Sequence, residues 1–303
     1  MMDLAETIKK LKKEKNAVIL AHNYQRPEVQ DIADYVGDSL GLSIEASKTD
    51  ADVIIFCGVY FMAETAKILS PGKKVVIPDK DAGCPMADMI TVQELRELKK
   101  RYPGAKILCY VNTFADIKAE SDVCCSSSNA VMVVEKAFRE NDEIIFVPDK
   151  YLADYAQKKT GKNLILWNGY CPSHVKILEE DIRKMKKAHP GAEVLVHPEC
   201  TAPVISLADE ILSTDGMVKY VKRSPAKEFI VATEPGIIHR LKKENPSKEF
   251  WPASGITECL NMKLITLDKV LRALETLQYE VDVPQKVITK AKKSIDKMLK
   301  YQD

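Results

Sequence analysis

Three cysteines recur at nearly equal intervals along this chain of 303 residues. Cys84, Cys171 and Cys259 are separated by 87 and 88 residues, and each follows a short apolar stretch that is typical of a β-strand. A glycine lies between each strand and its cysteine, as expected at a turn. This regularity predicts that the three cysteines occupy one position in a threefold internal repeat.

Three thiolates that meet at one point could bind zinc or an iron-sulfur cluster, or their meeting could be without function. A structural zinc ion usually takes four protein ligands with short cysteine spacing, which this chain lacks. A [4Fe-4S] cluster held by only three cysteines leaves one iron free to act as a Lewis acid on a substrate oxygen or nitrogen. The spacing by itself leaves these interpretations open.

The other five cysteines are assigned different roles. Cys57 and Cys109 lie within apolar strands and are expected in the core. Cys124 and Cys125 are expected to begin a helix, where a reactive thiol is an alternative to burial. Cys200 is expected to be buried or to lie just behind the site.

Polar side chains recur at the same intervals, at positions where the chain is expected to leave its strands. The equivalent sets are His22, Tyr110 and His197; Tyr24, Asn112 and Glu199; and Ser39, Ser127 and Thr214. In parallel sheets, ligands bind beyond the carboxyl ends of the strands, where helix N-termini present free N–H groups. We therefore expect these side chains to line one site together with the three cysteines. His174, three residues after Cys171, could lie next to a bound metal.

Strands and helices alternate along the chain, which predicts parallel sheets with helices on both faces. The repeat predicts three similar three-layer α/β/α units arranged about a pseudo-three-fold axis, with the active site at the centre. The expected boundaries are 1–88, joined by C-terminal helices at 264–303, then 89–175 and 176–263. Three strands in each unit would direct nine strand ends toward the centre.

Two predicted helices adjoin the polar sets. One is predicted at 27–37, where Ile32 and Val36 share a face, and another at 127–138. The three hydroxyl residues named above are expected at helix starts, where they could bind anions. A last amphipathic helix at 287–299 carries several lysines, and a solvated face is favoured there over contact with RNA or a partner.

The chain has an even balance of charge. Its 45 basic and 44 acidic residues give a formal net charge of +1, which offers no electrostatic basis for binding nucleic acid or an anionic membrane. No apolar run reaches the roughly 18 to 20 residues that cross a bilayer, and the N-terminus lacks a signal-peptide core. We therefore expect a cytoplasmic protein whose partners are small molecules.

Several longer motifs occur in order along nearly the whole chain. They are Ala-His-Asn-Tyr-Gln at 21–25, Gly-Asp-Ser at 37–39, Gly-Cys-Pro-Met-Ala-Asp at 83–88, Tyr-Val-Asn-Thr at 110–113, His-Pro-Glu-Cys at 197–200 and Ser-Thr-Asp-Gly-Met at 213–217. In these motifs the chain resembles the quinolinate synthases, the iron-sulfur enzymes of de novo NAD biosynthesis. The architecture of that family, three α/β/α units about a pseudo-three-fold axis, agrees with the repeat.

The resemblance implies a condensation of iminoaspartate with dihydroxyacetone phosphate that gives quinolinate, phosphate and water. It implies one [4Fe-4S] cluster per chain, held by Cys84, Cys171 and Cys259, with substrate on the fourth iron. L-Aspartate oxidase or dehydrogenase is a possible functional partner because one of them must supply the unstable imine.

The residues also suit this chemistry, which needs repeated proton transfers at carbon and oxygen. Glu199 is the candidate base, Tyr24 a proton relay, and His22 and His197 are hydrogen-bonding or acid/base groups. The expected substrate contacts are those of His22, Ser39, Tyr110, Asn112, Ser127, His197, Glu199 and Thr214. Two alternatives remain: an iron-sulfur hydro-lyase acting on a small carboxylic acid, and a non-catalytic, metal-dependent ligand sensor.

Overall fold

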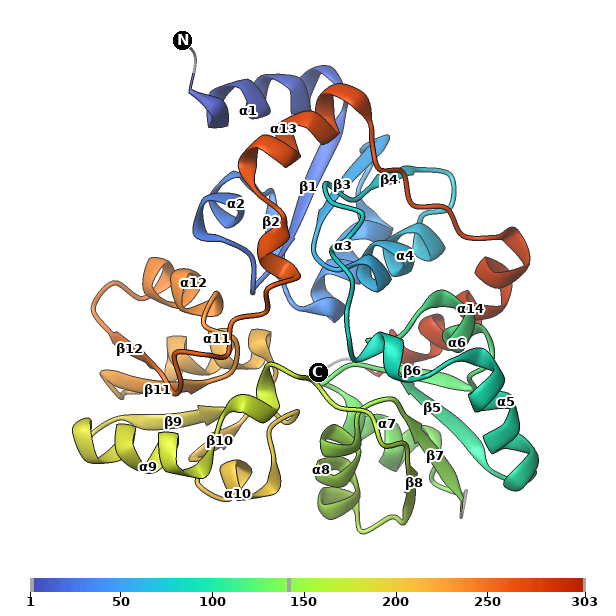
Figure 1. Cartoon of the computed structure of the whole chain (residues 1–303), viewed down its shortest axis with the longest axis vertical. Helices are drawn as coiled ribbons and strands as arrows, with labels where there is room; N and C mark the ends of the chain where they lie inside the picture. Colours follow the sequence, from blue (N-terminus) through green and yellow to red (C-terminus); the bar gives the residue numbers. More distant parts are fainter. Residues whose placement is uncertain (1–2, 141–142, 302–303) are drawn as a thin grey trace.

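The computed structural model describes residues 3–140 and 143–301, and it contains three parallel β-sheets of four strands each. Figure 1 shows the first sheet in the upper part of the molecule, the second at the lower right and the third at the lower left, each with its own helices. We call each sheet with its helices a sheet unit. The predicted α/β class with parallel sheets is confirmed.

The first sheet unit is formed by the N-terminal part of the chain. Its strands are β1 (Ala17–His22), β2 (Tyr35–Gly37), β3 (Val53–Cys57) and β4 (Lys74–Val76). Its helices are α1 (Leu4–Glu14), α2 (Pro27–Ile32), α3 (Ser39–Lys48) and α4 (Tyr60–Leu69). All of β3 is buried, as in a parallel strand covered on both faces. The Asp38 carboxylate starts α3 by accepting a hydrogen bond from the N–H of Gly41.

The second sheet unit repeats this order. Its strands are β5 (Lys106–Tyr110), β6 (Val123–Cys125), β7 (Ile144–Val147) and β8 (Leu164–Leu166). Its helices are η1 (Ala87–Met89), α5 (Val92–Arg101), α6 (Ala115–Ala119), α7 (Ala130–Ala137) and α8 (Lys150–Thr160). A capping box between Thr91 and Glu94 begins α5. Asp149 begins α8 by accepting two backbone hydrogen bonds, and Gly161, at φ 69°, ends it.

The third sheet unit follows the same order again. Its strands are β9 (Glu193–Val196), β10 (Glu210–Ile211), β11 (Glu228–Ala232) and β12 (Glu249–Pro252). Its helices are η2 (His174–Lys176), α9 (Glu179–Ala188), α10 (Ala202–Ile205), α11 (Thr214–Arg223) and α12 (Ile237–Glu244). The Ser213 hydroxyl begins α11 by accepting a hydrogen bond from the N–H of Gly216.

The strand order is the same in all three sheets. It is β2-β1-β3-β4 in the first, β6-β5-β7-β8 in the second and β10-β9-β11-β12 in the third. Every pairing is parallel, so the carboxyl ends of the strands of a sheet lie along one edge. Only three strands per unit were predicted. The strand that was missed in each unit is the edge strand that comes second along the chain.

These edge strands also correct two expected helices. The helix predicted at 27–37 ends at Ile32, and the chain continues as β2, where Val36 pairs with Ala21. The helix predicted at 127–138 begins only at Ala130. Cys124 and Cys125 were expected to start it, but they lie in β6 and are buried. Strands of two or three residues are too short to show the alternation that distinguishes a strand from a helix.

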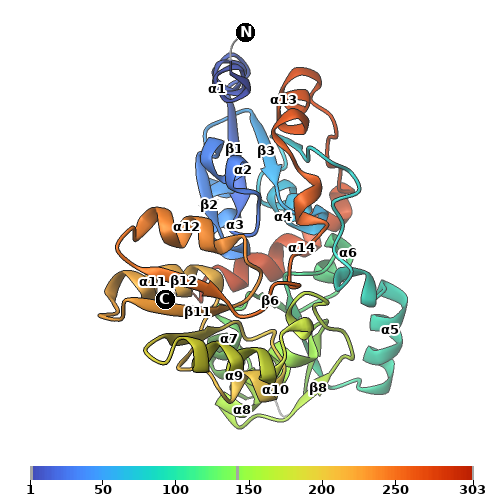
Figure 2. The same cartoon turned by 60° about the vertical axis from the view of Figure 1, so that its left-hand side comes forward.

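The C-terminal segment holds the first two sheet units together. After η3 (Met262–Leu264), α13 (Leu267–Thr276) packs beside α1 of the first unit. Helix α14 (Gln285–Met298) instead packs against α6 and β6 of the second unit and also contacts α4 (Figures 1 and 2). Its buried residues Ile288, Ala291 and Ile295 belong to the apolar core around the second sheet. In the described part of the chain, no helix combines the length and the apolar character that a bilayer crossing demands.

Candidate active site

One cavity collects side chains from the strand ends of all three sheet units. Each of the twelve residues predicted to act in catalysis, substrate binding or metal binding lines it: His22, Tyr24, Ser39, Cys84, Tyr110, Asn112, Ser127, Cys171, His197, Glu199, Thr214 and Cys259. His22 and Tyr110 are the last residues of β1 and β5, and His197 directly follows β9. The cavity therefore lies beyond the carboxyl ends of the first strand of each sheet.

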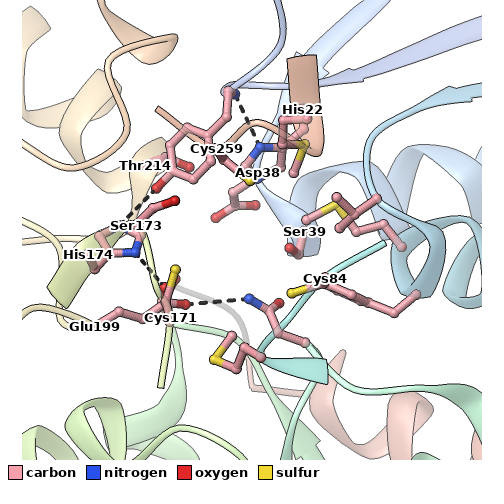
Figure 3. A pocket seen from close by; sticks show the side chains of 18 of the residues that line it. His22, Asp38, Ser39, Cys84, Cys171, Ser173, His174, Glu199, Thr214 and Cys259 are labelled. Carbon is pink, nitrogen blue, oxygen red and sulfur yellow. Dashed lines mark hydrogen bonds and ion pairs between the residues drawn. The ribbon is translucent and has the colours of Figure 1, made fainter. Parts of the chain in front are cut away.

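The cysteines fall into two groups by exposure. Cys84, Cys171 and Cys259 are partly exposed and line the cavity, and Figure 3 shows Cys84 and Cys171 approaching the same space from different sides. The other five cysteines are buried: Cys57, Cys109, Cys124, Cys125 and Cys200. All eight are free thiols. Only the three evenly spaced cysteines are therefore available to a ligand in the cavity.

Each cavity cysteine is followed by the same local structure. A 3-10 turn begins three residues after it, as η1 after Cys84, η2 after Cys171 and η3 after Cys259. Burial raises the pKa of all three thiols, that of Cys84 to about 12, while backbone N–H groups of the following turn act in the opposite direction. Deprotonation of these thiols therefore requires a further positive charge, such as a bound metal.

Glu199 is the buried anionic centre of the cavity. Its Oε1 accepts hydrogen bonds from the Tyr110 hydroxyl at 2.5 Å and from Asn112 Nδ2 at 3.4 Å. Its Oε2 lies 2.8 Å from Nδ1 of His174, a contact drawn in Figure 3. Burial alone would raise the pKa of Glu199, but His174, His197 and the hydrogen bonds hold it well below its usual value. Glu199 is therefore a carboxylate at neutral pH.

A chain of polar contacts connects this carboxylate to Tyr24. His174 Nε2 lies 2.8 Å from Oγ1 of Thr233, which is 2.5 Å from the Tyr24 hydroxyl. The Tyr24 hydroxyl is also 3.4 Å from His174 Nε2. Burial raises the pKa of Tyr24 well above its usual value, so the phenol stays protonated. His174 therefore lies between the Tyr24–Thr233 pair and the Glu199 carboxylate.

The other two histidines of the cavity are neutral. Burial lowers the pKa of both His22 and His197 to about 3. In each case Nδ1 faces the backbone N–H two residues on, that of Tyr24 at 3.2 Å and that of Glu199 at 3.4 Å. An Nδ1 that accepts this hydrogen bond carries no proton, so Nε2 bears it. His22 and His197 therefore each offer one ring N–H donor.

Comparison with known proteins agrees with this site. Residues 6–300 match the family described as Quinolinate synthetase A protein. The quinolinate synthase of Dehalococcoides mccartyi strain CBDB1 is 54% identical over 297 residues, which cover 98% of each chain. That of Methanosarcina barkeri strain Fusaro is also 54% identical, over 98% of this chain and 97% of its own.

The chain belongs to the quinolinate synthase family. The resemblance seen in the motifs is thereby confirmed, and the protein is an enzyme of NAD biosynthesis that uses small-molecule substrates. A third relative, from Thermodesulfovibrio yellowstonii, is 54% identical over 97% of both chains. Membership of the quinolinate synthases excludes the interpretation as a non-catalytic ligand sensor.

The hydroxyl residues differ in their positions relative to the helices. Ser39 and Thr214 are the first residues of α3 and α11, as predicted, so each lies at the positive end of a helix dipole. The Thr214 hydroxyl also accepts a hydrogen bond from Asn23 Nδ2 at 2.9 Å. Ser127 precedes α7 by three residues, which corrects its expected place at a helix start.

A second set of possible metal ligands overlaps the cysteine set. Cys171, His174 and Glu199 each present one ligand atom, and the three atoms lie within 4.8 Å of one another. His174 Nδ1 and Glu199 Oε2 lie 2.8 Å apart, but Nδ1 forms no hydrogen bond within the described residues. Three soft sulfur donors in a quinolinate synthase fit an iron-sulfur cluster better than this mixed S, N and O set.

The sequence analysis did not identify Thr233 as part of the polar network around Glu199, and it assigned His174 no role in that network. Thr233, the first residue after β11, was not considered although it obeys the same rule of strand ends as His22. His174 was considered only as a neighbour of a metal, whereas it bridges Glu199 and Thr233. Its place three residues after Cys171 was the available signal. Asp38, which also lines the cavity, was noted only as a helix start.

Proposed function

We propose that this protein condenses iminoaspartate with dihydroxyacetone phosphate and forms quinolinate, phosphate and water. The observation that carries the proposal is that three partly exposed cysteines and the buried Glu199 network line one cavity. Such a reaction needs anion binding, repeated proton transfer and polarisation of a carbonyl or imine. The cavity offers residues for each of these tasks.

We propose that Cys84, Cys171 and Cys259 hold one [4Fe-4S] cluster per chain. The fit is supported by their donor type, by their common access to the cavity and by the backbone N–H groups that the following turns direct at each thiol. When bound, a cluster with three protein ligands supplies a Lewis-acidic iron for a substrate oxygen or nitrogen. The remaining steps depend on side chains of the chain itself.

Substrate anions are proposed to bind at the hydroxyl residues. Ser39 and Thr214 combine a hydroxyl with the N-terminus of a helix, and this pairing suits a phosphate or a carboxylate. Ser127 adds a third hydroxyl from the second sheet unit. His22 and His197 would donate through Nε2–H to carbonyl or carboxylate oxygens of the substrate.

Proton transfer is proposed to centre on Glu199. Because its pKa is low, Glu199 is always available as an ionised acceptor, and Tyr110 and Asn112 fix its orientation. A weakly basic carboxylate is a slow acceptor by itself, so coupling to a relay is needed. Tyr24, with Thr233 and His174, provides that relay by donating at the substrate and recovering its proton from His174.

We further propose that the three sheet units are related by a pseudo-three-fold axis that passes through the active site. Supports for this arrangement are the recurring strand order and the equal spacing of the cysteines. The proposed units are 1–88, 89–175 and 176–263, and the segment 264–303 joins the first two because α13 contacts α1 and α14 contacts α6. The proposed setting is the cytoplasm, with L-aspartate oxidase or dehydrogenase as the source of the imine.

The test is an anaerobic assay on the purified protein. Iron and acid-labile sulfide are measured together with quinolinate formed from dihydroxyacetone phosphate and freshly generated iminoaspartate. We expect about four irons and four sulfides per chain and quinolinate formation that requires both substrates. Dehydration of a hydroxy acid without any need for the triose phosphate would instead identify a hydro-lyase.

A further inference from the structure

A second hollow opens beside the candidate active site. Its volume is about 750 Å³, and it shares Asp38 and Ser127 with the central cavity. Its walls include α3 of the first sheet unit, α7 and α8 of the second, and α11 of the third. We call this hollow the vestibule. Because the two spaces have wall residues in common, a molecule in the vestibule lies next to the active site.

The outer wall of the vestibule carries three cations. Lys219 and Arg223 are one turn apart on α11, and Lys159 comes from α8 of another sheet unit. All three side chains are exposed. Within the described ranges, none of them forms an ion pair with a carboxylate, and Lys159 lies only over the ring of Tyr155, 5.8 Å from its centre. Their charges are therefore available to a ligand.

The acidic groups of the vestibule do not cancel these charges. Asp215 is paired with Arg240, whose Nη1 lies 2.9 Å from Oδ1, and it also receives a hydrogen bond from Asn23. Asp38 is buried at the inner end, where burial and the nearby Asp215 raise its pKa to about 7. At neutral pH the vestibule thus presents a positive rim, because Asp215 is paired with Arg240 and Asp38 is only partly ionised.

We propose that the vestibule is the entry route for the phosphate-bearing substrate, and that Lys159, Lys219 and Arg223 capture this anion and direct it past Ser127 to the active site. This inference rests on the proposed function, because that function requires strongly anionic substrates. Like charges that line a concave surface focus the electric field and raise association rates by about 10- to 1,000-fold. The chain as a whole, with a net charge of +1, provides no such attraction.

The test removes the three charges without touching the active site. The triple variant Lys159→Gln, Lys219→Gln, Arg223→Gln is compared with the wild type for kcat/KM toward dihydroxyacetone phosphate, in roughly 0.02 M and 0.5 M salt. We expect the wild-type kcat/KM to fall as salt increases. The variant should be about tenfold slower than wild type at low salt, equal to it at high salt, and unchanged in kcat and iron content.

Two matched controls accompany this variant. Arg223→Lys keeps the charge at the rim and should behave as wild type, and Lys187→Gln removes an exposed lysine of α9 that lies outside the vestibule. Quinolinate formation that is indifferent to salt and to the triple variant would overturn the entry route alone. Failure of the wild-type protein to form quinolinate would overturn the proposed function. If Lys187→Gln lowers kcat/KM as much as the triple variant does, the effect comes from the net charge of the protein. This result would contradict the proposed role of the vestibule.

Discussion

A cysteine in the core of the first sheet and the cysteines of the central cavity have opposite surroundings. Cys57 lies in an apolar sheet core and is fully buried, whereas Cys84, Cys171 and Cys259 are partly exposed beside charged and polar groups. A thiol among apolar side chains behaves as a small hydrophobic residue. A thiol beside a cavity and backbone donors can become a metal ligand. Position relative to the strand ends, not residue type, separates the two roles.

The largest expected effect tests this division directly. Replacing Cys84, Cys171 or Cys259 by Ser should remove the visible absorption of the anaerobically purified protein and abolish quinolinate formation, because the cluster would lose a ligand. Cys57→Ser is the matched control in a sheet core and should keep absorption, iron content and activity. Equal loss of iron in the cavity variants and in Cys57→Ser would contradict the division.

The variant Glu199→Gln tests the role of Glu199 in proton transfer separately from the binding of the cluster by the cysteines. We expect its kcat to fall by about 10²- to 10⁴-fold, because an amide cannot accept the proton that the Glu199 carboxylate would take. Iron and sulfide should be unchanged because Glu199 is not a proposed ligand. Glu180→Gln, at an exposed position of α9, is the control. Wild-type kcat in Glu199→Gln would remove it as the base, and loss of iron would favour the mixed set of Cys171, His174 and Glu199.

Tyr24→Phe tests the relay more finely. It removes the hydroxyl that lies 2.5 Å from Thr233 and retains the ring, so kcat should fall by about 10- to 100-fold with little change in KM. Thr233→Val should have a smaller effect in the same direction, because Tyr24 also approaches His174 directly at 3.4 Å. A solvent deuterium isotope effect on kcat that is the same in Tyr24→Phe and wild type would contradict a relay through this hydroxyl.

The smallest effect concerns stability as a function of pH. His22 and His197 have a pKa of about 3 in the folded protein against 6.5 for a free histidine, because burial disfavours the charged form. The unfolded chain therefore binds more protons below pH 6.5, and the stability that these residues contribute above that pH is lost as the pH falls toward 3. Each of these two histidines should reduce the free energy of unfolding by up to about 1.4 kcal/mol for every unit by which the pH falls below 6.5.

Urea unfolding under anaerobic conditions at pH 7.5 and 5.5 measures this loss. The variant His197→Gln should lose less stability over this interval than the wild type, since it lacks one of the two groups. The same loss in both proteins would contradict a neutral, buried His197. Sheet-core variants such as Cys57→Ala should lower stability at both pH values by similar amounts, because no titrating group is changed.

The motifs and the repeat together predicted much of the site. Equal spacing identified the three cysteines and the polar sets at the strand ends, since a repeated fold places equivalent residues at equivalent positions. The short edge strands β2, β6 and β10 escaped because two or three residues carry no periodic signal. The position of Ser127 was wrong for a related reason. The short strand β6 was not recognised, and Ser127 lies in the turn that follows it rather than at the start of a helix.

The sequence by itself determined the α/β class, the family and twelve of the residues that line the cavity, because hydrophobic periodicity, family motifs and repeated spacing can all be seen in the chain. Only the tertiary structure decided which of these residues touch. Tyr24 and Thr233 are 209 positions apart, and their 2.5 Å contact exists because the first and third sheet units pack together. The vestibule likewise is formed by helices from all three units, so no local sequence pattern could have predicted it.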